Sequence, residues 1–390
     1  MNGYVHAKGR SIVDQQGNEL LLRGIGLGNW LLPEGYMFGF RRANSPRMID
    51  EAVCQLVGEE AARDFWTQFR QRYVTRDDIE LLAGCGCNHV RIPFSHRLFV
   101  TDTWPRRLEG PGYELIDRTI GWCRDLGISA ILDLHGAPGG QTGDNIDDSW
   151  GYPFLLIDER SRELTIELWT ELARRYANEP VVAGYELLNE PIATHFDRAR
   201  LNPLLNDLYQ GLVRAIRDVD PNHLIILGGS AWNTDFSLFE EPPDDNLAYA
   251  FHRYWAPVTP SLIEDYVAFR DRWNVPLYMS ESGENDDDWV ESFRALLESE
   301  SIGWAFWPYK KVNSTRGPVS IPAPPGWDAI VAFAEHPRAT FEQIREAHPG
   351  LERAASILEA YLGNLPLETC SVQNGFLKAL GLGGDPWNSV

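Results

Sequence analysis

Positive charge is scarce in this sequence. Its 390 residues carry 35 Lys and Arg against 56 Asp and Glu, which gives a net charge of -21. This acidic balance disfavours binding to a nucleic-acid backbone or to an anionic membrane surface. Long apolar runs are also missing, because no stretch approaches the roughly 18 residues that a membrane span needs. We therefore predict no nucleic-acid partner and no membrane association, and we expect a neutral ligand.

Targeting and linker signals are missing as well. Residues 1–6 do not join a basic segment to an apolar one, as a secretory signal would. The protein is thus predicted to be cytoplasmic, or secreted with its signal peptide absent from this sequence. No linker, repeat or low-complexity segment divides the chain, so we expect one domain over residues 1–390 and a monomer.

Cysteine is rare and its spacing fits no metal site. The five cysteines are Cys54, Cys85, Cys87, Cys123 and Cys370. Their number is odd, and a single residue separates Cys85 from Cys87, where zinc knuckles place two to four. We interpret them as reduced structural cysteines.

Hydrophobic residues are abundant, at 44% of the chain, and 14 of the residues are Trp. This content is enough for a large core. Most tryptophans pack in cores, but an excess is also what a protein needs to stack on the apolar faces of sugar rings. The composition therefore favours a carbohydrate among neutral ligands.

Eight short apolar runs alternate with segments of helical spacing, a pattern typical of a parallel sheet covered by helices. The expected strands are residues 23–28, 88–93, 129–135, 181–191, 224–229, 247–252, 276–281 and 302–307. They predict an α/β fold, a (β/α)8 TIM barrel, preceded by a β-hairpin within residues 1–20 that closes the barrel floor. Such barrels take about 250 residues. The surplus is assigned to long loops at 30–58, 136–157 and 308–327, and to a last helix and tail at 351–390.

The glycine-rich stretch 24–28 could be mistaken for a dinucleotide-binding loop. However, Asn29 stands where that loop needs its third glycine, and the following Trp30 does not open a helix. A nucleotide cofactor is therefore disfavoured, and no cofactor is expected.

Polar residues follow nearly every expected strand at its carboxyl end. They are Arg91, His135, Asn189, Glu190, His252, Tyr254, Glu281 and Trp307. Active sites of barrel enzymes are built at that end from several different strands. A single Arg or His would more often satisfy a backbone carbonyl, but agreement among so many strand ends indicates a site.

Two of these stretches resemble a known family. Residues 188–191, Leu-Asn-Glu-Pro, resemble the acid/base signature of glycoside hydrolase family 5, the cellulase-like family in the clan of retaining (β/α)8 glycosidases. Residues 279–285, Met-Ser-Glu-Ser-Gly-Glu-Asn, resemble its nucleophile strand. The resemblance implies Glu190 as the acid/base and Glu281 as the nucleophile. Glu284 is a weaker candidate, because it lies beyond a glycine, in the loop.

The resemblance also implies substrate-binding roles. Arg91 and Tyr254 would hold Glu281 ionised, Asn189 would donate to the sugar 2-hydroxyl, and Trp307 would form the floor under the sugar. His135 and His252 complete the expected binding set. Retaining glycosidases need carboxyl groups about 5 to 5.5 Å apart, one attacking the anomeric carbon and the other protonating the leaving oxygen.

The resemblance defines the identity of the substrate less closely than the mechanism. Residues 132–141 resemble the exo-acting 1,3-β-glucanases of the family, whereas residues 307–311, Trp-Pro-Tyr-Lys-Lys, differ from them. We expect a retaining β-glycosidase acting on β-glucans or β-glucosides, leaning to exo action. The alternatives are an endo-β-1,4-glucanase, a mannan or xyloglucan hydrolase, a non-catalytic carbohydrate-binding barrel, and a metal-dependent barrel using His135 and His252. No His-x-His pair supports the last.

The exo expectation rests on aromatic residues in two loops that should rise from the catalytic face, residues 33–58 and 141–153. These are Tyr36, Phe38, Phe40, Trp150 and Tyr152. Loops that close one end of a groove restrict attack to chain ends.

Three further tryptophans are left open between two roles. Trp150, Trp232 and Trp255 either stack on additional sugar units or pack in the protein.

Overall fold

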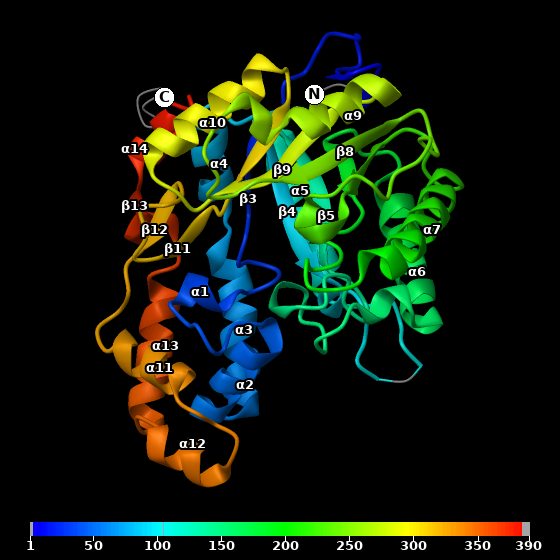
Figure 1. Ribbon diagram of the computed structural model, residues 1–390. Helices are drawn as coiled ribbons and strands as arrows, with labels where there is room; N and C mark the ends of the chain where they lie inside the picture. Colours follow the sequence, from blue (N-terminus) through cyan, green and yellow to red (C-terminus); the bar gives the residue numbers. More distant parts are fainter. Residues whose placement is uncertain (1–2, 104, 384–390) are drawn as a thin grey trace.

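The computed structural model describes residues 3–103 and 105–383. Within this part of the chain, eight parallel strands close a barrel in the order β10-β3-β4-β5-β6-β7-β8-β9 (Figure 1). Their bounds are β3 (Arg23–Gly26), β4 (His89–Ser95), β5 (Ser129–Gly136), β6 (Val182–Glu186), β7 (Leu224–Gly228), β8 (Leu247–His252), β9 (Leu277–Gly283) and β10 (Gly303–Trp307). The predicted (β/α)8 barrel is confirmed.

The N-terminal hairpin consists of β1 (His6–Lys8) and β2 (Ser11–Val13), paired antiparallel. Ile12 of β2 and Val5, just before β1, pack against inward-facing residues of the barrel strands, among them Ile131, Leu224 and Ile226. Burying these apolar side chains closes the interior at the end opposite the catalytic strand ends.

Helices cover the outside of the barrel, so its strands are buried on both faces. They are α4 (Arg76–Gly84), α5 (Gly112–Leu126), α6 (Glu159–Tyr176), α7 (Arg198–Arg217), α9 (Glu264–Trp273) and α10 (Asp287–Ser299). The helix α3 (Glu59–Tyr73) packs instead against the helix that precedes it, Pro46–Val57. In α6, Asp158 caps the first turn by accepting from the Ser161 amide. Its apolar stripe, with Leu168, Trp169 and Leu172, faces the sheet and is buried.

The segment 33–58 is not the long loop that we predicted. It forms α1 (Gly35–Phe38) and α2 (Pro46–Val57). Ser45 caps α2 by accepting from the Met48 amide, and Pro46 suits the first helical position. Phe38 and Phe40 are buried and stack with each other, so they pack in the core instead of lining a cleft.

The C-terminal part adds a second helical layer beside α2 and α3 (Figure 1). Its elements are β11 (Lys310–Val312), β12 (Val319–Ile321), α11 (Trp327–Glu335), α12 (Phe341–Ala347), α13 (Leu351–Gly363), β13 (Ser371–Val372) and α14 (Asn374–Ala379). α13 packs against α2 and α3, whereas α14 packs against the barrel helix α10. The expected tail also includes residues 384–390, which lie outside the described residues.

A buried ion pair ties this layer to the barrel. Lys310 Nζ lies 2.9 Å from Asp78 Oδ1 and donates to the Leu365 carbonyl at 2.8 Å. In the described part of the chain, no helix has the length and apolarity to cross a membrane.

Candidate active site

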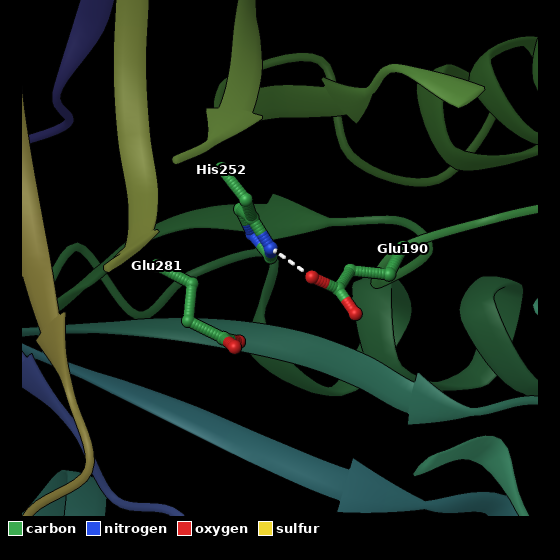
Figure 2. A group of neighbouring side chains, drawn as sticks. All are labelled: Glu190, His252 and Glu281. Atoms are coloured by element: carbon green, nitrogen blue, oxygen red, sulfur yellow. Dashed lines mark hydrogen bonds and ion pairs between the residues drawn. The ribbon is translucent and has the colours of Figure 1, made fainter. Parts of the chain in front are cut away.

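Glu190 and Glu281 face each other across the mouth of the barrel (Figure 2). Glu190 follows β6, and Glu281 lies near the end of β9. One carboxylate oxygen of each lies within 4.8 Å of the other and of a ring nitrogen of His252. Both side chains are largely buried, with 8% and 6% exposure. The predicted pair of carboxyl groups therefore meets in space.

Arg91 is a fully buried cation that four side chains share. It pairs with Glu186 through Nε at 2.7 Å and Nη2 at 3.1 Å. Nη1 donates to Glu281 Oε2 at 2.9 Å, and Nη2 reaches Asn189 Oδ1 at 2.7 Å and Asp133 Oδ2 at 3.0 Å. A fork of five donors on one planar group makes such sharing possible.

The backbone around Glu190 is held by the loop after β5. Glu190 has φ 45°, a conformation that is unusual for a residue with a side chain. Thr142 Oγ1 donates to the Glu190 carbonyl at 2.7 Å, and Gln141 Nε2 donates to the Asn189 carbonyl at 2.8 Å. This left-handed conformation changes the direction of the chain at Glu190, four residues after the end of β6.

The two carboxyl groups have different surroundings. Burial raises the pKa of Glu190 well above its ordinary value, and the nearby charges of Glu281 and Glu34 raise it further. Burial also raises the pKa of Glu281, but the Arg91 guanidinium and a hydrogen bond from Tyr254 oppose that rise. Tyr254 donates to Glu281 Oε1 at 2.7 Å. Of the two carboxyl groups, Glu190 therefore keeps its proton more readily, and Glu281 ionises more readily.

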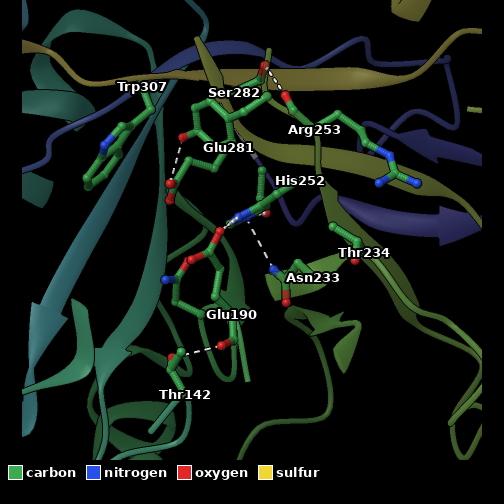
Figure 3. Close-up of polar contacts among 12 residues, drawn as sticks. Thr142, Glu190, Asn233, Thr234, His252, Arg253, Glu281, Ser282 and Trp307 are labelled. Carbon is green, nitrogen blue, oxygen red and sulfur yellow. Dashed lines mark hydrogen bonds and ion pairs between the residues drawn. The ribbon is translucent and has the colours of Figure 1, made fainter. Parts of the chain in front are cut away.

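His252 contacts Glu190 directly. Its Nδ1 lies 2.7 Å from Glu190 Oε1, and its Nε2 lies 2.9 Å from Ser280 Oγ and 3.2 Å from Asn233 Nδ2 (Figure 3). Burial lowers the pKa of His252 well below its ordinary value, so the ring is neutral.

Trp307 lies over the end of β3. A Cβ added at Gly26 would lie 2.7 Å from its ring, and one at Gly28 would lie 2.5 Å from it. The ring of His135 stacks on that of Trp307 with centroids 5.4 Å apart and an angle of 6°. Gly26 and Gly28 therefore make room for the Trp307 indole. This packing explains the glycine-rich stretch 24–28 without a role in binding phosphate.

Tyr36 from the expected pocket wall and the three tryptophans with open roles differ in their surroundings. Tyr36 reaches the site, because Trp307 Nε1 donates to its hydroxyl at 2.8 Å. Trp150 and Trp255 are 71% and 70% exposed, whereas Trp232 is partly buried. An Arg47 guanidinium lies 3.6 Å above the Trp150 ring. The two exposed rings are available for stacking.

Several site residues were missed by sequence reasoning. Asp133 and Glu186 are fully buried partners of Arg91, and the signal for them was a carboxylate inside an apolar strand. Glu34 is buried, with 5% of its surface exposed, and one of its carboxylate oxygens has no hydrogen-bond partner among the described residues. Asn233 gave no signal, since it lies in a turn. Glu284 pairs with Lys311 Nζ instead of facing Arg91.

The cluster Glu190, His252 and Glu281 is compact enough to offer ligand atoms to a cation. However, both ring nitrogens of His252 are already hydrogen-bonded, which leaves no free lone pair for a metal. Both oxygens of Glu281 are also engaged, by Arg91 and Tyr254. Each Glu281 oxygen keeps a second lone pair, so the argument against a metal rests on His252, whose neutral ring has a single lone pair that is already used.

Comparison with known families identifies this arrangement. Residues 51–313 match the model of the family described as Cellulase (glycosyl hydrolase family 5). The chain belongs to glycoside hydrolase family 5. It is thus an enzyme, a glycoside hydrolase acting on β-glucans or related glycosides, and not a non-catalytic barrel.

Relatives of this family-5 enzyme carry different names. A Beta-xylosidase from Phanerodontia chrysosporium is 32% identical over 80% of this chain and 71% of its own length. Endoglucanase C from Acetivibrio thermocellus is 28% identical over 64% of this chain and 89% of its own. A solved structure, described as an endogalactoceramidase, covers 97% of this chain and 84% of its own at TM-score 0.63 and 18% identity, which supports the fold alone.

Proposed function

We propose that this family-5 enzyme is a retaining β-glycosidase that works by double displacement, with Glu281 as nucleophile and Glu190 as acid/base. The observation that carries the proposal is the pair of carboxylate oxygens within 4.8 Å across the barrel mouth. Inverting enzymes need about 6.5 to 9.5 Å between the groups, to leave room for a water. The roles are assigned from the surroundings of the two groups: Arg91 and Tyr254 favour ionised Glu281, whereas burial and neighbouring negative charge favour protonated Glu190.

In the first step, Glu281 attacks the anomeric carbon while the bond to the leaving oxygen breaks and Glu190 gives that oxygen its proton. In the second step, a water attacks the same carbon, Glu190 takes the water proton, and the bond to Glu281 breaks. Consumption of the Glu281 charge in the intermediate lowers the pKa of Glu190, which suits it to act as base.

The remaining residues bind and orient the sugar. Asn189 sits between Arg91 and His135, where its amide is fixed to donate to the 2-hydroxyl, a contact that strengthens in the transition state. Trp307, backed by the His135 ring, offers an apolar surface under the sugar. Arg91 and Tyr254 keep Glu281 ionised and oriented.

For the substrate, we propose release of a terminal sugar or short oligosaccharide from a β-glucan or a small β-glycoside. Support comes from the Tyr36 hydroxyl, which accepts from Trp307 Nε1 at the edge of the indole, and from the Beta-xylosidase relative, whose match spans most of the chain. The Endoglucanase C relative supports the second candidate, mid-chain cleavage. A product profile on laminarin, cellulose, xylan and aryl glycosides separates the two: random mid-chain cleavage would contradict exo action.

Proton NMR of the first product tests the mechanism. We expect the β-anomer to form first from an aryl β-glucoside or β-xyloside, and initial release of the α-anomer would contradict retention. In parallel, Glu281→Ala should abolish turnover while sugar binding remains. We further propose that residues 1–390 act as one catalytic domain, because the helical layer packs directly on α2 and α3.

A further inference from the structure

Directly after β7, the backbone takes three left-handed residues in succession. Ala231, Trp232 and Asn233 have φ of 54°, 62° and 56° in the short element α8 (Ser230–Asn233). Residues with a Cβ rarely adopt this conformation once, and three times in a row needs strong support from the surroundings. Here the Thr234 amide closes the turn on the Ser230 carbonyl at 2.9 Å.

The turn presents one fully buried side chain to the active site. Asn233 Nδ2 lies 3.2 Å from His252 Nε2 (Figure 3). The amide presses against the end of β7, where a Cβ on Gly228 would lie 2.5 Å from Asn233 Oδ1. The turn and the glycine together place this amide beside the histidine.

Hydrogen-bond roles around His252 follow from donor chemistry. An amide nitrogen can only donate, whereas the Ser280 hydroxyl on the same ring nitrogen can donate or accept. The structure turns Asn233 Nδ2 toward His252 Nε2 and leaves Asn233 Oδ1 without a hydrogen-bond partner among the described residues, and in this orientation of the amide His252 Nε2 is the acceptor. Because the neutral ring carries one proton, that proton sits on Nδ1, which then donates to Glu190 Oε1 at 2.7 Å.

We propose that Asn233 is a positioning residue for acid catalysis, because it fixes the His252 tautomer that donates to Glu190 and so keeps the acid proton on the other carboxyl oxygen. The inference rests on the proposed acid/base role of Glu190. In the first step, the proton on Glu190 Oε2 passes to the leaving oxygen, while the Nδ1 proton of His252 stays in place and stabilises the carboxylate that forms. No proton passes through the histidine.

A simpler reading is that Asn233 is there only because Asn tolerates a left-handed turn. Asn233→Gly separates the two, since glycine keeps the conformation and removes the amide. Asn233→Asp keeps the shape but replaces the donor by an acceptor, which favours the opposite tautomer. Ala231→Gly is the matched control, because it relaxes the same turn without touching His252.

The experiment compares kcat/KM for phenyl and 2,4-dinitrophenyl β-glucosides and the matching β-xylosides. Dinitrophenolate needs no acid assistance, whereas phenolate does. We expect Asn233→Gly to lower kcat/KM about tenfold on the phenyl glycosides and less than about twofold on the dinitrophenyl ones. Asn233→Asp should lose more on the phenyl substrates, and Ala231→Gly should match the parent enzyme.

The pH profile gives a second readout. Losing the enforced Nδ1 donor removes a hydrogen bond from ionised Glu190, so its pKa rises and the alkaline limb of kcat/KM moves to higher pH. The charged and titratable groups that interact with Glu190 stay unchanged in the variants; they are Glu281, Glu34, Arg91, Asp133, His252 and Tyr254.

Equal losses on both leaving groups with an unmoved alkaline limb, in Asn233→Gly or in Asn233→Asp, would overturn the proposal. Glu190→Ala, measured alongside, tests the assumption beneath it. If that variant keeps its activity on phenyl glycosides, the assigned acid/base role fails, independently of what Asn233 does.

Discussion

Trp307 Nε1 donates a hydrogen bond to the Tyr36 hydroxyl at 2.8 Å, which joins the last barrel strand to the first helix after β3. The contact fixes one edge of the indole on which we place the sugar. Lys311 Nζ lies 5.3 Å from the centroid of the Tyr36 ring and pairs with Glu284, so the tyrosine is itself held by a charged neighbour.

Tyr36→Phe tests the importance of this contact. The change leaves the indole N–H without its acceptor, and we expect kcat/KM on an aryl glycoside to fall about fivefold, in line with about 1 kcal/mol for a hydrogen bond. Tyr113→Phe is the control, since that buried hydroxyl has no hydrogen-bond partner among the described residues. An unchanged rate in Tyr36→Phe would mean that the indole keeps its position without the tyrosine.

Gly28→Ala tests the packing of Trp307 from the opposite side. The new methyl group would lie 2.5 Å from the ring, so the indole must shift. We expect kcat/KM to fall about a hundredfold, the cost of an ångström-scale misplacement in an active site. Gly121→Ala in α5 has open space around its Cβ and should leave activity unchanged. Parent-like kinetics in Gly28→Ala would argue against Trp307 as the sugar platform.

Arg91→Met should lower stability as well as abolish turnover. It leaves buried carboxylates without their cation, and such a loss costs about 3 to 5 kcal/mol in the free energy of unfolding. Arg10→Ala breaks the exposed pair with Asp271 and should cost less than about 1 kcal/mol. Urea unfolding at pH 7 measures both. Equal midpoints for the two variants would show that Arg91 is not a structural cation.

Glu281→Gln should lower the pKa of Glu190. Removing the neighbouring negative charge removes one of the causes that raise this pKa, so Glu190 ionises at a lower pH than in the parent enzyme. Carbon-13 NMR titration of the Glu190 carboxyl group measures the shift. Glu34→Gln should shift the pKa of Glu190 less, because burial raises the pKa of Glu34 itself well above its ordinary value and so disfavours the charge that this variant would remove. A rise in either variant would contradict the electrostatic picture.

Dialysis against EDTA should leave turnover unchanged. Both ring nitrogens of His252 already have protein partners, so its single lone pair is in use and we expect no metal in the reaction. Activity that disappears after chelation and returns with zinc would revive the metal-dependent interpretation.

The barrel could be predicted because its strands are apolar runs and nearly all of them are followed by a polar residue. The carboxyl ends of the parallel strands then predict that Glu190 and Glu281 lie at the barrel mouth, and the structure brings them together with Arg91, which reaches Glu281 from within β4. The sequence could not reveal Asn233, since its contact with His252 depends on a left-handed turn that no local pattern signals.

The segment 33–58 was misjudged for a related reason. Its aromatic residues resemble those of a pocket wall, but Phe38 and Phe40 meet α3 and α11 residues distant in sequence, including Trp66 and Trp327. Whether an aromatic ring faces solvent or core depends on such distant partners. Shortening this segment would therefore remove core packing as well as the site edge.

The sharing of Arg91 has a consequence for how this enzyme can change. Four side chains from three other strands and a loop depend on one guanidinium, and each of them in turn fixes where it points. Replacing any one of them alone leaves a buried charge or donor unmatched. Viable routes to a new activity should therefore run through the outer aromatic residues, Tyr36, Trp150 and Trp255, while substitutions around Arg91 survive only as compensating pairs.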